Sequence, residues 1–506
     1  MNKINTSFEH AVDILIIGGG ISGAALARDA AGRGLKVMLV ERDDYSAGTS
    51  SGSSKLIHGG LLCLDHLNIR TTKNILKERE ILLKNAPHLV RQDKFLIPAI
   101  KSRSRSTWKI KLGLKFYDFL ANSRVFPKSK RLTQTDSEEF YHLRKEHLKS
   151  VYCYSDCHTK DNRLVIAQLL DARSKGADIR NRCEVTSIEK AENGFKVSLN
   201  DDKINRIVKA RFIFNVTGPW VNTVNKRFAG RLESQKTRLI RSSHIAIAMP
   251  KPALTSTFVL QNSDGQALFA FPWNNGRYLV IGTTAVAHTG TPSQAACTVE
   301  EMAYLLAAYN TYFSHTKGLL RPIDILWHWA GIRSFVFDGT LTPSKLKQRT
   351  KILTEKSGNG AFMSVYGTEL ILHRQFAEKL ITDLGRYGLN IERPWTRDAK
   401  LPGGQMTRDE LTKIAEDGPE SIPLSVRKRW AFLYGDYIEN FFDTVYASSH
   451  SPKMITPAIA EIELKHAFEK EDARSASDFL YRRTELFIDL DADAKKSIQT
   501  WFDQAI

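Results

Sequence analysis

The sequence predicts an α/β fold, α+β over the whole chain, with a parallel sheet near the N-terminus. Residues 14–40 place an alanine-rich segment between two apolar runs, the pattern of a strand–helix–strand unit that is buried on both faces. Residues 235–290 alternate apolar and polar side chains, which is typical of a second, mixed sheet. From about residue 391 onward the apolar spacing is that of amphipathic helices.

The strand–helix–strand unit contains the pattern Gly-x-Gly-x-x-Gly at Gly18, Gly20 and Gly23. The first glycine allows a tight turn, the second lets the backbone approach a pyrophosphate, and the third lets the helix pack on the strand. The N-terminus of that helix offers backbone N–H groups to the phosphates. Glu41 ends the second strand, where a carboxylate can accept hydrogen bonds from ribose hydroxyls. These features predict a dinucleotide site without deciding between FAD and NAD.

Composition narrows the choice of partners. The chain has 506 residues, 42% hydrophobic and 25% charged, which is typical of a globular protein with more than one domain. Its net charge of +18 favours an anionic partner, namely a phosphorylated ligand, an acidic membrane surface or nucleic acid. No aromatic–basic repeat or helix-turn-helix pattern is present, so no nucleic acid is expected. The five cysteines form no zinc pattern, so no metal is expected, and the start of the chain lacks the features of a secretion signal.

Further motifs follow along the chain. They read TSSGSSKLIHGG at 49–60, KEREILLKNAPHL, YSDCHTKDNRLV, NVTGPWV, FPWNNGRYLVIGTT, WAGIRSF and LPGG. On these motifs and the glycine-rich unit, the chain resembles the FAD-dependent glycerol-3-phosphate dehydrogenases, membrane-associated enzymes that pass electrons to quinone. The resemblance covers nearly the whole length, and it favours FAD over NAD.

The resemblance implies a Rossmann-like FAD-binding domain with an interleaved mixed-sheet substrate domain in residues 1–390, and a helical C-terminal domain in residues 391–506. FAD would lie extended along the first sheet, with its flavin ring near residues 53–60 and Gly218. The expected cofactor-binding residues are Gly18, Gly20, Gly23, Glu41, Arg42, Thr49, Ser50, Ser53, Lys55, Leu56, His58, Gly59, Gly218 and Gly367.

The family oxidises the C2 hydroxyl of sn-glycerol 3-phosphate to give dihydroxyacetone phosphate, with hydride transfer to the flavin. His58 and His244 are the candidate bases, because an imidazole titrates near neutral pH and can take the hydroxyl proton. Arg333 is the candidate phosphate ligand, because a guanidinium can donate two parallel hydrogen bonds to a phosphate. From the sequence alone, a structural histidine and an ion-paired arginine are the alternative interpretations.

Four positions depart from the family pattern. Leu62 and Cys63 stand where the family has Arg-Tyr, Glu369 stands where it has a lysine, and Ala285 replaces an aspartate. Loss of one charge-assisted hydrogen bond to phosphate costs about 1.5–3 kcal/mol. The basic residues that could compensate are Lys345, Lys347, Arg349 and Lys351. Two alternatives to glycerol-3-phosphate oxidation therefore stay open: a non-phosphorylated hydroxy or amino substrate, and a catalytically impaired FAD-binding paralogue.

Residues 101–131 combine basic and apolar side chains. Trp108, Phe116 and Phe119 would lie on one helix with lysines and arginines on both flanks, which suits an anionic lipid interface. A packed surface helix with solvated charges is the alternative. We therefore expect a cytoplasmic protein held peripherally at the inner membrane, with ubiquinone and membrane lipids as partners and with a homodimer left open.

Overall fold

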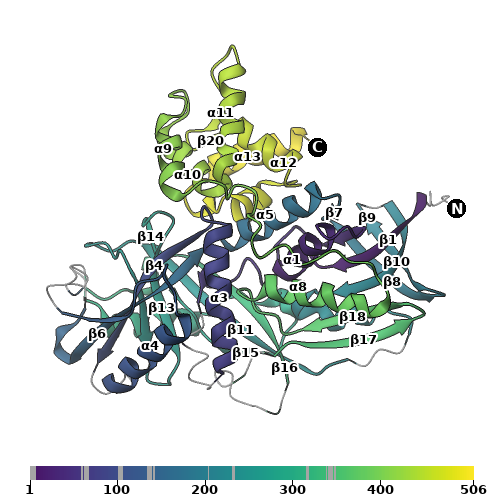
Figure 1. Cartoon of the computed structure of the whole chain (residues 1–506). Helices are drawn as coiled ribbons and strands as arrows, with labels where there is room; N and C mark the ends of the chain where they lie inside the picture. The colour runs from purple at the N-terminus through teal and green to yellow at the C-terminus, as the bar shows by residue number, and fades with distance from the viewer. Residues whose placement is uncertain are drawn as a thin grey trace.

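The computed structural model describes residues 7–58, 61, 68–100, 106–133, 140, 143–202, 204–230, 234–314, 318–337, 339, 346 and 349–505. Two sheets lie beside each other, and the helical C-terminal part sits above the junction between them (Figure 1). The predicted fold class, a FAD-binding α/β domain with a mixed-sheet domain and a helical C-terminal domain, is confirmed. The exact boundary between residues 390 and 391 stays a prediction.

Among the described residues the first sheet has eight strands, and its centre is parallel because β1 pairs in parallel with both β2 and β10. Its main path runs in the order β17 (Lys351–Ser357), β18 (Gly360–Tyr366), β10 (Ile204–Asn215), β1 (Ser7–Ile17), β2 (Val37–Val40) and β7 (Asp178–Arg180). The dipeptide Asn193-Gly194 in the sequence is a strong signal for a tight hairpin turn, and a hairpin at this position joins β8 (Cys183–Ala191) to β9 (Gly194–Asp201). One core cluster covers a face of this sheet with α1 (Ile21–Ala31), α5 (Asp161–Ser174) and α8 (His373–Asp383).

The second sheet, which comes mostly from the middle of the chain, has ten strands within the part that the structure describes. Its main path is β15 (Val286–His288), β11 (Thr237–Ala248), β14 (Tyr278–Gly282), β13 (Ala267–Trp273), β12 (Thr257–Gln261), β4 (Val90–Ile100), β6 (Leu148–Thr159) and β3 (Leu56–Ile57). Two further strands pair with this path, β16 (Ile325–Val336) with β11 and β5 (Lys130–Leu132) with β6.

Helices pack on both faces of the second sheet. On one face α7 (Val299–Tyr312) buries Leu305 and Tyr309 in a core with β11 to β14. On the other face lie α4 (Thr107–Ala121) and the C-terminal part, which share a core with Trp273 and Tyr278. The long helix α3 (Ile69–Asn85) runs between the two sheets in Figure 1. The short helix α6 (Val221–Asn225) follows β10.

The C-terminal part is built from α9 (Arg408–Asp417), α10 (Leu424–Tyr434), α11 (Ile438–Ala447), α12 (Glu461–Glu469) and α13 (Ala492–Ala505). A short hairpin, β19 (Met454–Thr456) and β20 (Ile459–Ala460), joins α11 to α12. Thr407 begins α9 with a capping box that Glu410 completes, and the buried Trp430 lies at the centre of this part's own core.

Candidate active site

A cavity of about 2110 Å³ lies where the two sheets meet. On one side it is lined by the carboxyl ends of β1, β2, β10 and β18, and on the other by residues of β11, β13 and β16. Open α/β sheets bind their ligands at the carboxyl ends of their strands. The cavity is therefore the place where the predicted cofactor and substrate residues should come together.

At the start of α1, the glycine-rich turn lets a ligand approach the protein backbone closely. Gly18 has a φ of +115°, and a Cβ there would lie 3.0 Å from the carbonyl oxygen of Val216. A Cβ on Gly20 would lie 3.0 Å from Ser50 Oγ, the atom that accepts a hydrogen bond from the Ile21 amide. Gly23 does not line the cavity, and a Cβ there would lie 1.9 Å from the Gly18 carbonyl oxygen. These close approaches fit the pyrophosphate of a dinucleotide beside the helix N-terminus.

Glu41 lies at the end of β2 on the cavity wall, where the sequence predicts the ribose contact. Its Oε2 accepts a hydrogen bond from the Gly19 amide at 2.7 Å, and its Oε1 accepts one from the Asp43 amide at 2.9 Å. Burial raises the pKa of Glu41, and these two amides act in the opposite direction. Since each carboxylate oxygen can accept more than one hydrogen bond, the group can still bind ribose hydroxyls.

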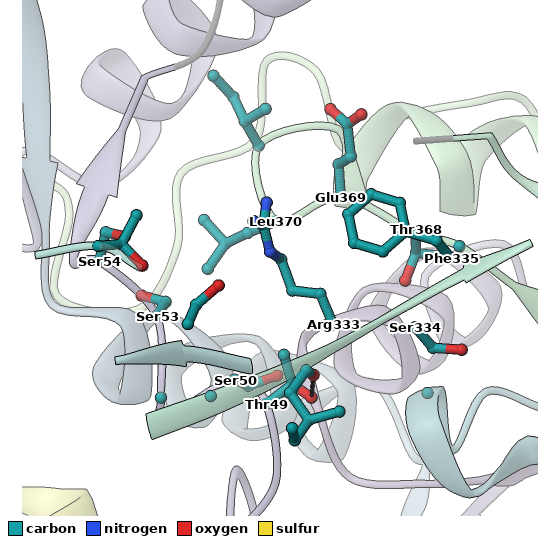
Figure 2. Close-up of a pocket in the computed structure, with 18 of the residues that line it drawn as sticks. Thr49, Ser50, Ser53, Ser54, Arg333, Ser334, Phe335, Thr368, Glu369 and Leu370 are labelled. Carbon is teal, nitrogen blue, oxygen red and sulfur yellow. Dashed lines mark hydrogen bonds between the residues drawn. The ribbon is translucent and has the colours of Figure 1, made fainter. Parts of the chain in front are cut away.

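A hydroxyl-rich loop at residues 47–54 closes the cavity against β16. Thr49 Oγ1 donates a hydrogen bond to the Ile332 carbonyl at 2.6 Å. A Cβ on Gly52 would lie only 2.8 Å from Gly331 Cα, so the two backbones touch here. Ser50, Ser53 and Ser54 are drawn together on one side of the pocket in Figure 2.

Both candidate histidines line the cavity and are held uncharged. His244, on β11, stacks on the Trp329 ring at 4.9 Å and shares a 3.0 Å hydrogen bond between its Nε2 and Ser54 Oγ. Burial, together with the charges of Lys55 and Arg333, lowers the pKa of His244 to about 3. His58 lies 4.5 Å from the Phe269 ring centre, and burial lowers its pKa to about 4. At neutral pH both imidazoles are therefore uncharged and can accept a hydrogen bond from a hydroxyl group, while the low pKa values make both of them weak bases.

Arg333 projects from β16 into the cavity toward the turn that carries Glu369 and Leu370 (Figure 2). Burial lowers the pKa of Arg333, while the Glu369 carboxylate acts to raise it. Burial also raises the pKa of Glu369, and the Arg333 charge lowers it. In this part of the cavity a ligand would therefore meet the guanidinium of Arg333 together with the carboxylate of Glu369. Arg349 lines the cavity as well.

The remaining predicted residues divide into three groups. Arg42, Leu56, Gly218 and Gly367 line the cavity, as does Ala285. Lys55 does not line it, because its ammonium group is paired with the buried carboxylates Asp161 and Glu485. Lys351 is exposed on β17 and donates a hydrogen bond to Gln235. The predicted positions that lie outside the described residues are Gly59, Leu62, Cys63, Lys345 and Lys347.

The structure adds lining residues that the sequence did not single out. Trp220 follows the Gly218 turn, and a Cβ on Gly48 would lie 3.0 Å from its ring. Cys183, Val185 and Arg227 extend the wall beyond Glu41 and Arg42. The aromatic residue in the sequence NVTGPW was the only signal for Trp220. Cys183 and Val185 depend on how β8 packs beside β2, and Arg227, which follows α6, depends on its ion pair with Glu184 of β8; a local pattern shows neither arrangement.

An apolar arm of the cavity leads away from the histidines toward α3 and α4. Its apolar lining residues are Leu61, Ile69, Ile75, Ile97, Trp108, Leu112, Phe116 and Val259, and the polar residues Asn68, Thr71, Ser106 and Lys109 line the same region. Although Trp108 and Leu112 line the cavity, both are also exposed to solvent, with fractional exposures of 61% and 60%. The arm therefore joins the interior of the cavity to the exposed apolar side of α4.

The family of FAD dependent oxidoreductases matches residues 13–371, more than two thirds of the chain. The chain belongs to this family. It is accordingly an oxidoreductase with FAD as its cofactor, which confirms the predicted cofactor. A second family, described as the C-terminal domain of alpha-glycerophosphate oxidase, matches residues 394–503.

Individual relatives extend the likeness over nearly the whole chain. It is 33% identical to the D-erythritol 1-phosphate dehydrogenase of Brucella abortus, over 97% of this chain and 98% of the relative. It is 34% identical to the glycerol-3-phosphate dehydrogenase of Pseudomonas aeruginosa, over 94% of this chain and 91% of the relative. The structure of glycerol-3-phosphate dehydrogenase from Bacillus halodurans complexed with FAD superimposes with a TM-score of 0.78 at 26% identity, covering 98% of this chain and 90% of that one.

Proposed function

We propose that this flavoprotein oxidises the C2 hydroxyl of sn-glycerol 3-phosphate to give dihydroxyacetone phosphate. The observation that carries the proposal is the meeting of Arg333 with two uncharged histidines, His58 and His244, in the FAD-side cavity. An alcohol of this kind needs a cation for its phosphate and a base for its hydroxyl proton. The names of the Pseudomonas and Bacillus relatives point to the same substrate.

Each of these residues has a separate task in the proposal. Arg333 binds the phosphate and so fixes the distance of the C2 carbon from the flavin side of the cavity. His58 or His244 accepts the C2 hydroxyl proton at a ring nitrogen. FAD, when bound, supplies the hydride acceptor. The hydroxyl-rich loop at residues 47–54 separates these groups from solvent on one side.

Glu369 favours a second candidate, a longer polyol phosphate. Its carboxylate lies in the cavity beside Arg333, where it would repel a phosphate dianion but could accept hydrogen bonds from additional hydroxyl groups. The name of the Brucella relative, D-erythritol 1-phosphate dehydrogenase, is consistent with such a substrate. A non-phosphorylated hydroxy or amino substrate would also suit a carboxylate at this position.

An anaerobic titration separates these candidates. The absorbance of oxidised FAD is followed after addition of sn-glycerol 3-phosphate, D-erythritol 1-phosphate or unphosphorylated glycerol. Bleaching by sn-glycerol 3-phosphate supports the proposal. Bleaching by D-erythritol 1-phosphate alone would instead identify the longer polyol phosphate as the substrate. Absence of bleaching with both phosphates would refute the assignment of a polyol phosphate.

A substitution at Glu369 tests the same question from the protein side. Glu369→Lys replaces a repelling charge with the attracting one that the family has at this position. If Glu369 selects against a compact phosphate, KM for sn-glycerol 3-phosphate should fall about tenfold or more in this variant. Glu369→Gln is the matched control, because it removes the negative charge without adding a positive one, and it should give a smaller decrease.

We further propose that a membrane quinone accepts the electrons and that α4 holds the protein at the bilayer. The apolar arm suits an apolar acceptor, and it opens beside the exposed side chains Trp108 and Leu112. Within the part of the chain that the structure describes, no helix is long and apolar enough to span a membrane. Reduction of a soluble ubiquinone analogue by the substrate-reduced enzyme tests the acceptor. A reduced flavin that the analogue does not reoxidise would refute it.

A further inference from the structure

The loop that lines the cofactor cavity is bound at both of its ends by side chains of the C-terminal helical part. At the first end, Asp44 forms a bidentate ion pair with Arg483, and both N–O distances are 2.8 Å. The neighbouring Tyr45 donates a hydrogen bond from its hydroxyl group to Asp472 at 2.9 Å. Asp44, Tyr45 and Arg483 are all buried. This end of the loop directly follows Glu41.

At the second end, the Lys55 ammonium group connects the loop to the C-terminal part. Lys55 Nζ lies 2.8 Å from Glu485 Oε1 and 2.9 Å from Asp161 Oδ1. Asp161 Oδ2 in turn accepts a hydrogen bond from Ser53 Oγ at 2.6 Å, and Ser53 lines the cavity. The other oxygen of Glu485 lies 2.9 Å from Lys160 Nζ. A carboxylate of the C-terminal part is thus connected to the cavity wall through three successive contacts.

The same ammonium group faces the candidate base. Lys55 Nζ lies 5.9 Å from the centre of the Trp329 ring, and Trp329 stacks on His244. Ser54, the residue before Lys55, is hydrogen-bonded to His244. The position of Lys55 therefore affects the loop, and its charge lies close enough to affect His244.

Because these charged groups are buried, the contacts between them are energetically important. Lys55, Asp161 and Glu485 are all buried, so each charge has lost most of its hydration and depends on its partners. Lys160 and Lys55 hold the pKa of Glu485 well below its usual value despite burial, so it is ionised at neutral pH. Glu485 also has a φ of +58°, a left-handed conformation that persists in a non-glycine residue only where the surroundings impose it.

We propose that the C-terminal part is a component of the FAD site, in which Glu485, acting through Lys55 and Asp161, positions the loop at residues 47–54 against the cofactor. Glu485 and Lys55 are positioning residues, since neither lines the cavity. The inference concerns cofactor binding and is independent of the substrate that the enzyme oxidises.

The test compares two buried carboxylates of the C-terminal part. Glu485→Gln removes the charge that holds Lys55. Glu463→Gln is the matched control, because Glu463 is fully buried and forms an ion pair with Arg429 of the same part, without contact to the loop. Both variants should lower the melting temperature of the apoprotein. Only Glu485→Gln should raise the dissociation constant for FAD, by about tenfold or more.

The dissociation constant is measured by quenching of flavin fluorescence on addition of FAD to the full-length apoprotein. An unchanged value in Glu485→Gln, or an equal increase in Glu463→Gln, would overturn the proposal and leave the contacts with a purely stabilising role. Should Glu485→Gln fail to accumulate, Tyr45→Phe replaces it. This variant loses only the hydroxyl contact to Asp472 and should weaken FAD binding severalfold, and unchanged binding would count against the proposal.

Discussion

Arg333 is the side chain on which the proposed substrate binding depends most directly. Replacement by Met removes the charge and the forked donor from the cavity, so we expect KM for sn-glycerol 3-phosphate to rise by about ten- to a hundredfold, because a hydrogen bond to a charged group contributes roughly 1.5–3 kcal/mol. Steady-state kinetics with a soluble electron acceptor give the value. Arg333→Lys keeps the charge but not the fork and should fall between the wild type and the Met variant.

A KM that is unchanged in Arg333→Met would show that the phosphate binds elsewhere, with Arg349 as the next basic residue on the cavity wall. The double variant Arg333→Met with Arg349→Met would then show, by its KM, whether Arg349 binds the phosphate. The position of Arg333 in the pocket could be predicted from WAGIRSF only through the family resemblance, because nothing local in that strand distinguishes it from a surface arginine.

His244 should make the folded state less stable in acid. Its pKa is about 3 in the folded protein against an ordinary value near 6.5, so below pH 6.5 the unfolded chain takes up a proton that the folded chain excludes. The free energy of unfolding should therefore fall as pH decreases through this window. Between pH 7.5 and 5 the contribution is about 2 kcal/mol.

His244→Gln keeps a side chain that can hydrogen-bond to Ser54 but does not titrate in this range. Urea unfolding of the apoprotein at both pH values should therefore show a smaller acid loss in the variant, by about that amount. His288 is partly exposed on β15, where its ring shares a hydrogen bond with the Thr291 carbonyl, so His288→Gln serves as the control. An identical pH dependence in wild type and His244→Gln would mean that His244 is accessible to protons in the folded state.

At the scale of elements, the glycine-rich turn depends on the contact between α1 and β1. A Cβ on Gly23 would lie 1.9 Å from the Gly18 carbonyl oxygen, and this neighbour is backbone that cannot rotate away. Gly23→Ala should therefore displace the turn and abolish or strongly weaken FAD retention during purification. Gly385→Ala is the control, because no atom lies within 4 Å of its added Cβ. Equal FAD content in the two variants would refute the packing role of Gly23.

Helix α4 carries the predicted membrane contact. Its Phe119 is 74% exposed, and the lysines of the same helix are free to approach anionic headgroups. Phe119→Glu should weaken sedimentation with vesicles that contain anionic lipid by about tenfold or more, since burying a Phe side chain contributes about 1.5–3 kcal/mol. Tyr446→Glu makes the same change of charge at an exposed aromatic residue of α11 and should leave binding unchanged.

The elements that the sequence predicted well are those specified by local patterns. The glycine-rich turn, the strand that ends at Glu41 and the Asn193-Gly194 hairpin each depend on residues within a short stretch. Lys55 shows the limit of such patterns. It was expected to contact the cofactor, whereas its ammonium group is paired with Asp161 and Glu485, at separations of 106 and 430 residues. Only tertiary packing brings partners so distant in sequence together.

On the scale of the whole molecule, the contacts at Asp44 and Lys55 connect cofactor binding to the C-terminal part. A ligand that binds only the folded state stabilises it by about 2.7 kcal/mol at a hundred times its dissociation constant. If FAD orders the loop at residues 47–54, that stabilisation should extend through Lys55 and Arg483 to the segment 478–485, which opens less often when FAD is bound.

Hydrogen exchange measures this coupling directly. Amides of residues 478–485 should exchange more slowly in the FAD complex than in the apoprotein, whereas those of α9 should be unaffected, because α9 packs within the core of the C-terminal part. In Glu485→Gln the protection of 478–485 by FAD should decrease, while protection at the glycine-rich turn persists in the FAD-saturated protein. Equal protection of both segments in the variant would separate the C-terminal part from the cofactor site, so that their shared apolar core at Trp273 and Tyr278 would remain as the contact between them.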